Sequence, residues 1–381
     1  MFDLDEQQSA LKDAAAEAAM AILGDTLKED DESETFRPEY LHALGEAGLC
    51  GVQTPEEYGG LGLGYTEYTI ILEEIARISA SYAVSVAVTG LPQVILATYG
   101  TEAQKEKYLP SLAMGETIGA FALSEPGSGS DAASLQASAV LEGDQYRLNG
   151  TKFWITHGGY ADLYVVMART GGEGPRGISA FLVPGDTPGL SFGKKEEKMG
   201  LRASPTVEVV LRDVLIPTEN RLGAEGDGFK VAMSALDSGR ITIAAISVGI
   251  AQASLDTSGA YACQRKQFKQ AIIDFQGVGF MLADMACKIE ASRLMVRKAA
   301  GLRDAGKEYS HIAAMAKCVA TDSSIQVATD AVQVLGGYGY TREYPVERYM
   351  RDAKVMQIVE GTNQVQRLVI SRHIKRLYAE M

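Results

Sequence analysis

The stretch Lys354-Val-Met-Gln-Ile-Val-Glu-Gly-Thr-Asn-Gln-Val-Gln-Arg367 sets one carboxylate, that of Glu360, directly after the apolar pair Ile358-Val359 and directly before a glycine. A carboxylate in an apolar setting loses hydration, so its anion becomes a stronger base. Gly361 has no Cβ and lets a ligand approach the backbone closely, and Thr362 is a good N-cap for a following helix. The pattern predicts a proton-abstracting base at the mouth of a helix, although a solvated loop carboxylate before a helix would read the same way.

The chain on either side of this stretch divides into three blocks. From Leu4 to about Ile118 the pattern is helical and alanine-rich, with breaks at Gly24, at the charged segment Lys28 to Glu34 and at Tyr58 to Gly62. Gly100 and Thr101 predict a helix stop and a new N-cap. We therefore expect an all-α N-terminal domain over residues 1–118.

Short β-like runs separated by turns begin at Ala120, and helices return at Phe229. The expected strands are Phe121 to Ser124, Gln136 to Leu141, Tyr146 to Leu148, Leu163 to Ala168, Ile178 to Val183 and Thr206 to Leu211, with a hairpin turn over 142–144. The later helices carry apolar residues at steps of three and four: Leu282, Met285, Ile289, Ser292, Val296 and Ala299 in one helix, and Ile325, Ala328, Val332 and Leu335 in another. The predicted fold class is α+β in blocks, with an all-β middle domain (119–228), a small barrel or sandwich, and an all-α C-terminal bundle (229–381).

Composition excludes several classes of function. With 46% hydrophobic residues in 381, the chain is long enough for more than one core, and its 36 basic against 49 acidic residues give a net charge of −13. That charge argues against a nucleic-acid or anionic-membrane surface. Four scattered cysteines and four separated histidines form no metal-ligand pattern, which favours a reducing compartment and no metal. The acidic N-terminus is unlike a signal peptide, and the longest apolar tract, Ile241 to Ala253, is too short to span a bilayer, so a cytoplasmic protein without membrane insertion is expected.

The loop Leu123-Ser-Glu-Pro-Gly-Ser-Gly-Ser-Asp131 joins a strand end to glycines and serines that can offer N–H groups and hydroxyls to a polar ligand. It is neither a Walker loop nor a Rossmann fingerprint, because no Gly-Lys-Ser/Thr follows and no βαβ unit surrounds it. By itself the loop is typical of a surface turn.

Together with Lys152-Phe-Trp-Ile-Thr-His-Gly158 and the Glu360 stretch, however, this loop resembles three motifs of the acyl-CoA dehydrogenase family, in the family's order and over most of the chain. The resemblance implies the fold, an FAD cofactor and flavin contacts at Phe121, Leu123, Ser124, Trp154 and Thr156. A planar flavin needs an aromatic surface, and a hydroxyl donor stabilises the nitrogen that receives hydride. From its residue type alone, Trp154 could equally be a core residue. His157 departs from the small polar residue that relatives more often have and is assigned no role.

The same resemblance assigns further residues to ligands. For the acyl-CoA substrate they are Ser130, Asp237, Arg240 and Gly361, where Asp237 and Arg240 precede the apolar helix from Ile241. For FAD they are Arg265, Gln267, Phe268, Gln276, Gln333, Gly336, Gly337, Thr362 and Gln364. The family's Phe-Gly-x-Pro pattern is replaced here by Phe268-Lys-Gln-Ala271, which puts the local turn in doubt. From residue type alone, these are helix-terminal charges and a glycine C-cap. The family's contacts around Arg265 and Gly336 cross between subunits, which implies a homo-oligomer, typically a tetramer.

The reaction implied is α,β-dehydrogenation of an acyl-CoA thioester. Glu360 removes the α-proton while the β-hydrogen leaves as hydride to FAD, and electrons then pass to electron-transfer flavoprotein. No acid lies between Ser238 and Ser247, where some relatives carry the base, which supports Glu360. Alternatives on the same fold are an acyl-CoA oxidase and a decarboxylating glutaryl-CoA-type enzyme, although the latter's pocket arginine is missing from Ser79 to Val86. An alternative of another class is a non-catalytic CoA-ester or flavin-binding scaffold. Val359, where straight-chain relatives often have tyrosine, hints at a branched or cyclic acyl group.

Overall fold

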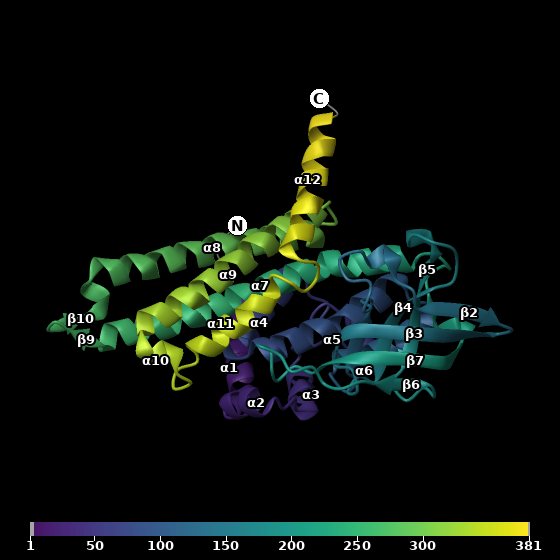
Figure 1. Ribbon diagram of the computed structural model, residues 1–381, viewed down its shortest axis with the longest axis horizontal. Helices are drawn as coiled ribbons and strands as arrows, with labels where there is room; N and C mark the ends of the chain where they lie inside the picture. Colours follow the sequence, from purple (N-terminus) through teal and green to yellow (C-terminus); the bar gives the residue numbers. More distant parts are fainter. Residues whose placement is uncertain (1–3, 380–381) are drawn as a thin grey trace.

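A computed structural model describes residues 4–379 and shows a helical block, a β-sheet block and a second helical block in succession (Figure 1), which confirms the predicted fold class. The first block contains α1 (Glu6–Leu23), α2 (Leu27–Ser33), α3 (Pro38–Glu46), α4 (Tyr65–Ile78), α5 (Ala80–Tyr99) and α6 (Glu102–Ala113). The expected break at Lys28 to Glu34 is wrong, because this charged segment forms α2. Its first-turn Asp30 accepts a hydrogen bond from Thr26 Oγ1 at 2.7 Å and pairs with Arg37 at 2.9 Å. Thr101 caps α6 with a capping box, as predicted.

The middle block is one eight-stranded sheet with the order β6-β7-β3-β2-β4-β5-β8, with β1 pairing parallel to β4. The strands are β1 (Gly119–Ala122), β2 (Ser138–Glu142), β3 (Gln145–Thr156), β4 (Leu163–Arg169), β5 (Ile178–Pro184), β6 (Leu190–Phe192), β7 (Thr206–Pro217) and β8 (Arg221–Leu222). Short 3-10 turns lie at Glu56–Tyr58, Ala132–Ser134, Pro175–Gly177, Thr218–Asn220 and Ile272–Asp274. The hairpin turn after Glu142 is confirmed. The strand expected over Tyr146 to Leu148 instead runs on to Thr156, because β7 pairs with it through two irregularities in register that interrupt the alternation of its side chains.

The third block is a bundle of long helices. It contains α7 (Gly228–Gln264), the hairpin of β9 (Lys266–Gln267) and β10 (Gln270–Ala271), α8 (Gln276–Asp304), α9 (Ser310–Leu335), α10 (Gly337–Tyr340), α11 (Val346–Met356) and α12 (Asn363–Ala379). All six residues of the stripe predicted on α8 are buried. The apolar helix expected from Ile241 begins earlier, at Gly228, so Asp237 and Arg240 lie within α7 rather than before it. Figure 1 shows α12 rising away from the rest of the molecule.

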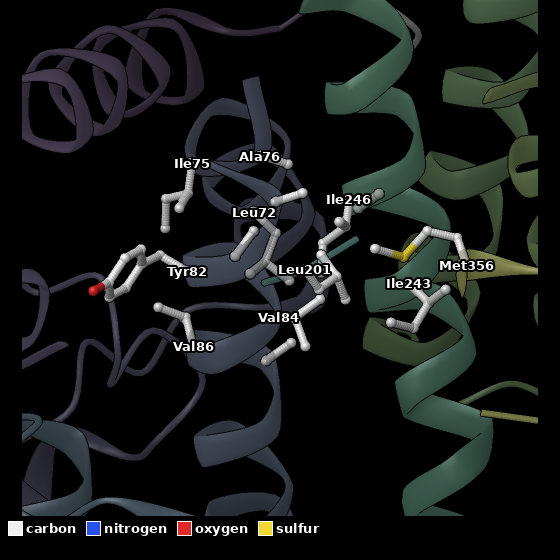
Figure 2. Close-up of a cluster of buried hydrophobic side chains, with 14 of the residues drawn as sticks. Leu72, Ile75, Ala76, Tyr82, Val84, Val86, Leu201, Ile243, Ile246 and Met356 are labelled. Carbon is white, nitrogen blue, oxygen red and sulfur yellow. The ribbon is translucent and has the colours of Figure 1, made fainter. Parts of the chain in front are cut away.

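Residues of all three blocks share a core. Figure 2 shows Leu72 and Val84 of the first block beside Leu201 of the middle block, with Ile246 of α7 and Met356 of α11 opposite. Burying each such side chain contributes roughly 1.5–3 kcal/mol. By length and composition, the helices α5 and α7 could each cross a membrane, so the expectation that the longest apolar tract is too short is wrong. However, 89% of the most apolar 18-residue segment of α5 and 78% of that of α7 are buried inside the protein. Their apolar surfaces are therefore covered by the protein's own elements.

Candidate active site

Glu360 lies in the turn between α11 and α12, with a left-handed backbone (φ 54°) followed by Gly361 at φ 86°. This conformation costs a non-glycine residue about 1–2 kcal/mol, and it turns the side chain back toward α7. The carboxyl oxygen Oε2 is buried and has no hydrogen-bond partner among the described residues. Burial raises the pKa of Glu360 to about 7, against the opposing effect of Arg240 and Lys317. A buried, unpartnered carboxylate of raised pKa is suited to accept a proton.

Gly239 of α7 makes room for this carboxyl group. A Cβ atom built on Gly239 would lie 2.8 Å from Glu360 Cδ, which is closer than real Cβ atoms come to neighbouring atoms. The absence of a side chain at position 239 therefore allows the carboxyl group to lie directly against the helix.

Polar side chains hold the backbone carbonyls of Glu360 and of the following Gly361. Gln366 Nε2 donates to the carbonyl oxygens of Glu360 at 3.0 Å and Gly361 at 2.8 Å. Lys317 Nζ, on α9, donates to the Gly361 carbonyl at 3.0 Å and to Asn363 Oδ1 at 2.9 Å. Burial lowers the pKa of Lys317 to about 8, while Glu360 acts in the opposite direction. Three fixed carbonyl contacts thus maintain the left-handed turn.

The two residues assigned to CoA on α7 lie at the same place. Arg240 is 5% exposed and forms an ion pair with Asp237, and its buried Nε has no hydrogen-bond partner within residues 4–379. Burial raises the pKa of Asp237, opposed first by Arg240 and then by Ser310, whose hydroxyl donates to it at 2.9 Å. Arg240 also lowers the pKa of Glu360, so its guanidinium lies near the reactive carboxyl group. Thr362 caps α12 through a bond from Val365 N to its hydroxyl at 3.3 Å.

A buried ion pair joins the two motifs of the sheet. Phe153 N donates to the Ser124 carbonyl at 2.8 Å, and Lys152 Nζ donates to the Leu123 carbonyl at 3.1 Å and to Glu125 Oε1 at 2.8 Å. Lys152 is fully buried, and burial lowers its pKa to about 8 against the effect of Glu125. Glu125 also accepts hydrogen bonds from Gln136 N and Ala137 N. The pair fixes the Leu123 to Asp131 loop against β3, so the residues assigned to the flavin ring come together.

Trp154 is not a core residue. It is 59% exposed and has a left-handed backbone (φ 62°) beside the register shift of β3, which turns its ring out of the sheet. A large aromatic surface held open beside the half-buried Thr156 hydroxyl fits a planar ring that would cover both. His157 points the other way: it is fully buried, its Nδ1–H donates to the Gly119 carbonyl oxygen at 3.0 Å, and its ring stacks on Phe36 at 5.4 Å. Burial lowers the pKa of His157 to about 4, so the ring is neutral and structural.

The end of β3 is connected to the Glu360 turn through one loop. Thr156 pairs with Thr206 at the start of β7, and the preceding Leu201 donates its N–H to Asp352 Oδ1 of α11 at 2.6 Å. Because α11 leads directly into the Glu360 turn, this contact ties the sheet to the base. Ser130 lies exposed in the loop before β2.

Most of the remaining residues assigned to the cofactor lie far from this group. Arg265, Gln267, Gly336 and Gly337 line a surface cavity of about 530 Å³ at the end of α7 and α9. Gln333 lies one turn earlier on α9, while Phe268 and Gln276 are exposed beside the hairpin without lining the cavity, and Gln364 is exposed on α12. Gly336, at φ 60°, ends α9 as the predicted glycine C-cap.

One helix separates the two groups. Gly239 lies beside Glu360 and Arg265 directly follows the end of α7, so at 1.5 Å per residue they lie about 39 Å apart along the helix axis. Figure 1 shows the β9–β10 hairpin and α10 at the end of the molecule opposite the sheet. A single FAD molecule cannot bridge this length, so the distal cavity of one chain does not serve the Glu360 site of the same chain.

Several residues of the site carried no specific signal in the sequence. Lys317, Gln366 and Gly239 resemble ordinary helix residues, and only the fold brings them to the Glu360 turn. The pair of Lys152 and Glu125 was detectable in principle, because one of the two linked motifs contains the glutamate and the other contains the lysine.

Comparison with known proteins agrees with this geometry. Models of the N-terminal, middle and C-terminal domains of acyl-CoA dehydrogenase match residues 5–116, 120–214 and 226–375. The short-chain specific acyl-CoA dehydrogenase of Clostridium acetobutylicum is 45% identical over 98% of this chain and all of its own. Among solved structures, butyryl-CoA dehydrogenase from Megasphaera elsdenii superposes with a TM-score of 0.96 at 44% identity, over 98% of this chain and 99% of that one. A chain from the structural study of the electron-transferring flavoprotein of Acidaminococcus fermentans gives 0.96 at 47% identity, again over 98% and 99%.

Family membership thus rests on matches that span all three blocks and on a fold that superposes over nearly the whole chain. The protein belongs to the acyl-CoA dehydrogenase family of FAD flavoproteins, oxidoreductases that act on the CH–CH bond of acyl-CoA thioesters.

Proposed function

We propose that Glu360 is the general base in the FAD-dependent dehydrogenation of a short-chain acyl-CoA to the 2-enoyl-CoA. The observation that carries the proposal is the buried Glu360 Oε2, which has no partner among the described residues and a carboxyl pKa of about 7. Activity should rise with pH through that value, because only the deprotonated carboxylate can accept the α-proton. The positive charges of Arg240 and Lys317 lower the pKa of Glu360 against the effect of burial, so the carboxylate can form near neutral pH.

The chain's own groups bind, orient and polarise the substrate. The Glu360 N–H would donate to the thioester carbonyl and stabilise the negative charge that develops there as the α-proton leaves. Gly361 leaves the backbone open to the thioester, and Trp154 with Thr156 would hold the isoalloxazine ring against the substrate. Bound FAD supplies the acceptor for the β-hydrogen, which leaves as hydride.

The substrate class, the electron acceptor and the assembly are part of the proposal. Support for a short acyl chain comes from the similar proteins, which are short-chain specific and butyryl-CoA dehydrogenases, and Val359 leaves space for a short branch beside the base. The likeness to a chain studied with an electron-transferring flavoprotein supports such a flavoprotein as electron acceptor. The 39 Å separation supports an FAD site completed by a second chain, in a homo-oligomer such as a tetramer. We place the enzyme in the cytoplasm, in line with its bacterial relatives.

The test is the variant Glu360→Gln, which keeps the size of the side chain but removes the base. Anaerobic mixing with butyryl-CoA should bleach the flavin about 10²- to 10⁴-fold more slowly than in the wild type, with FAD content unchanged. Unchanged bleaching would remove Glu360 from the mechanism. Reoxidation of the reduced enzyme by air rather than by electron-transfer flavoprotein would identify an oxidase instead.

A further inference from the structure

Two histidines that are distant in sequence meet where α12 leaves the body of the protein. The helices α9 and α12 are joined by a series of contacts that begins with Asn363 Nδ2 to Thr321 Oγ1 at 2.9 Å and continues with Arg367 to Asp322 at 2.9 Å. The series ends at His311 and His373, whose rings stack with centroids 3.7 Å apart and planes within 6°. Because His311 and His373 lie far apart in the sequence, no local pattern predicted this pairing.

A carboxylate completes a set of three potential ligands. Glu308 lies two residues before α9, and its Oε1 lies 3.7 Å from His311 Nδ1, too far for a hydrogen bond. His311 Nδ1 is buried without a hydrogen-bond partner among the described residues. One ligand atom from each of Glu308, His311 and His373 lies within 4.8 Å of the other two. Three potential ligand atoms are thus gathered at one place.

We propose that Glu308, His311 and His373 bind one divalent transition-metal ion of the Zn²⁺ type, which links the start of α9 to α12. Imidazole nitrogen and carboxylate oxygen are the ligands that Zn²⁺ takes at about 2.0–2.2 Å, which in a tetrahedral site places ligand atoms roughly 3.3 Å apart. Since stacked rings point their lone pairs in parallel, the His373 ring must rotate for both nitrogens to meet one ion. The exposed Glu308 side chain is free to follow, and water would take the fourth position.

Two charged side chains near the cluster act on an incoming cation in opposite directions. Lys298 on α8 repels an incoming cation, and the Glu308 carboxylate offsets that repulsion.

The ion would stiffen a part of the molecule that few other contacts hold. Beyond His373, α12 exposes Ile374, Leu377 and Tyr378 on its surface, and Figure 1 shows this half of the helix standing clear of the body. A metal bridge at His373 would hold the last point at which α12 contacts α9. The bridge does not depend on the proposed reaction, because none of its ligands touches Glu360.

The experiment titrates Zn²⁺ into chelator-treated holoenzyme by calorimetry. The wild type should bind one ion per chain, and His373→Ala should weaken binding by about 10-fold or more. Arg372→Ala is the matched control: it alters the exposed neighbour on the same helix and should bind as the wild type does. Glu308→Gln and His311→Ala should also weaken binding, and if the latter fails to fold, His373→Ala decides the matter.

Two further readouts separate a specific site from loose surface binding. Co²⁺ in place of Zn²⁺ should give the visible absorption of a four-coordinate complex in the wild type and in Arg372→Ala, but not in His373→Ala. Zn²⁺ should also slow amide hydrogen exchange in α12 of the wild type, but not in α12 of the histidine variants. No saturable Zn²⁺ uptake by the wild type, or equal affinity in His373→Ala, would overturn the proposal.

Discussion

A methyl group at position 239 would meet Glu360 Cδ at 2.8 Å, so Gly239→Ala should push the carboxyl group away from α7. A displacement of 1 Å at a reacting group can cost about 10²-fold in rate, and we expect flavin bleaching to slow by about that factor with FAD still bound. Gly259→Ala on the same helix is the control, because nothing lies within 4 Å of its Cβ. Equal rates for the two variants would show that the carboxyl group does not need the space at Gly239.

Lys317 combines a structural contact with an electrostatic one. Its ammonium holds the Gly361 carbonyl at 3.0 Å and lowers the pKa of Glu360, so Lys317→Met should raise that pKa above about 7. With a higher pKa, the carboxylate that acts as the base forms only at higher pH. The acid limb of the pH profile, where the bleaching rate rises with pH, should therefore move to higher pH. Lys375→Met, exposed on α12, should leave the limb in place. A slower rate with an unmoved limb would leave Lys317 with a structural role only.

At the scale of elements, the β9–β10 hairpin shows how the chain tolerates its departure from the family pattern. The turn residues Phe268 and Lys269 both have left-handed backbones, with φ of 51° and 69°, yet Ala271 still pairs with Lys266. The hairpin that carries Gln267 therefore forms without the glycine and proline of relatives, with the strain held in two side-chain-bearing residues.

That strain predicts a stabilising substitution. Lys269→Gly removes the clash of Cβ with the left-handed backbone and should stabilise the protein by about 1 kcal/mol, measured by urea unfolding of the holoenzyme. Lys266→Gly, in the extended strand of the same hairpin, should give no gain, because it only adds flexibility to the unfolded chain. A gain in both variants, or in neither, would contradict strain at Lys269.

At the scale of the whole molecule, the separation of Glu360 from Arg265 predicts complementation between chains. Glu360→Gln and Arg265→Ala chains should each be inactive, the second through loss of FAD. In a mixed oligomer, the Arg265→Ala chain supplies Glu360 and its neighbour supplies Arg265, so one site of the pair is intact. Unfolding and refolding an equal mixture should restore about a quarter of wild-type activity, measured with butyryl-CoA, if chains pair at random.

The matching control mixes Glu360→Gln with Thr156→Ala, a residue of the same half-site. In every pairing of these two chains each site lacks either the base or the Thr156 hydroxyl, so activity should stay low. Recovery in neither mixture would show that each chain builds its FAD site alone.

The sequence by itself determined the order of the three blocks and the buried stripe of α8, because periodicity of apolar residues is a local property that survives in the chain. It also singled out Glu360, since an apolar pair before a carboxylate and a glycine after it are local signals. The charged segment of α2 and the long strand β3 escaped this reasoning, because a contact outside the segment itself decides each of them: Arg37 across the following turn, and β7 across the sheet.

Only the tertiary structure decided what surrounds the base. Lys317 and Gly239 come from helices far from Glu360 in sequence. No local pattern shows that Lys317 binds the backbone beside Glu360 or that Gly239 leaves room for the Glu360 carboxyl group. The pairing of His311 with His373 was hidden for the same reason. Local propensity acts over a few residues, whereas burial, charge and ligand geometry depend on which distant segments the fold brings within a few ångströms.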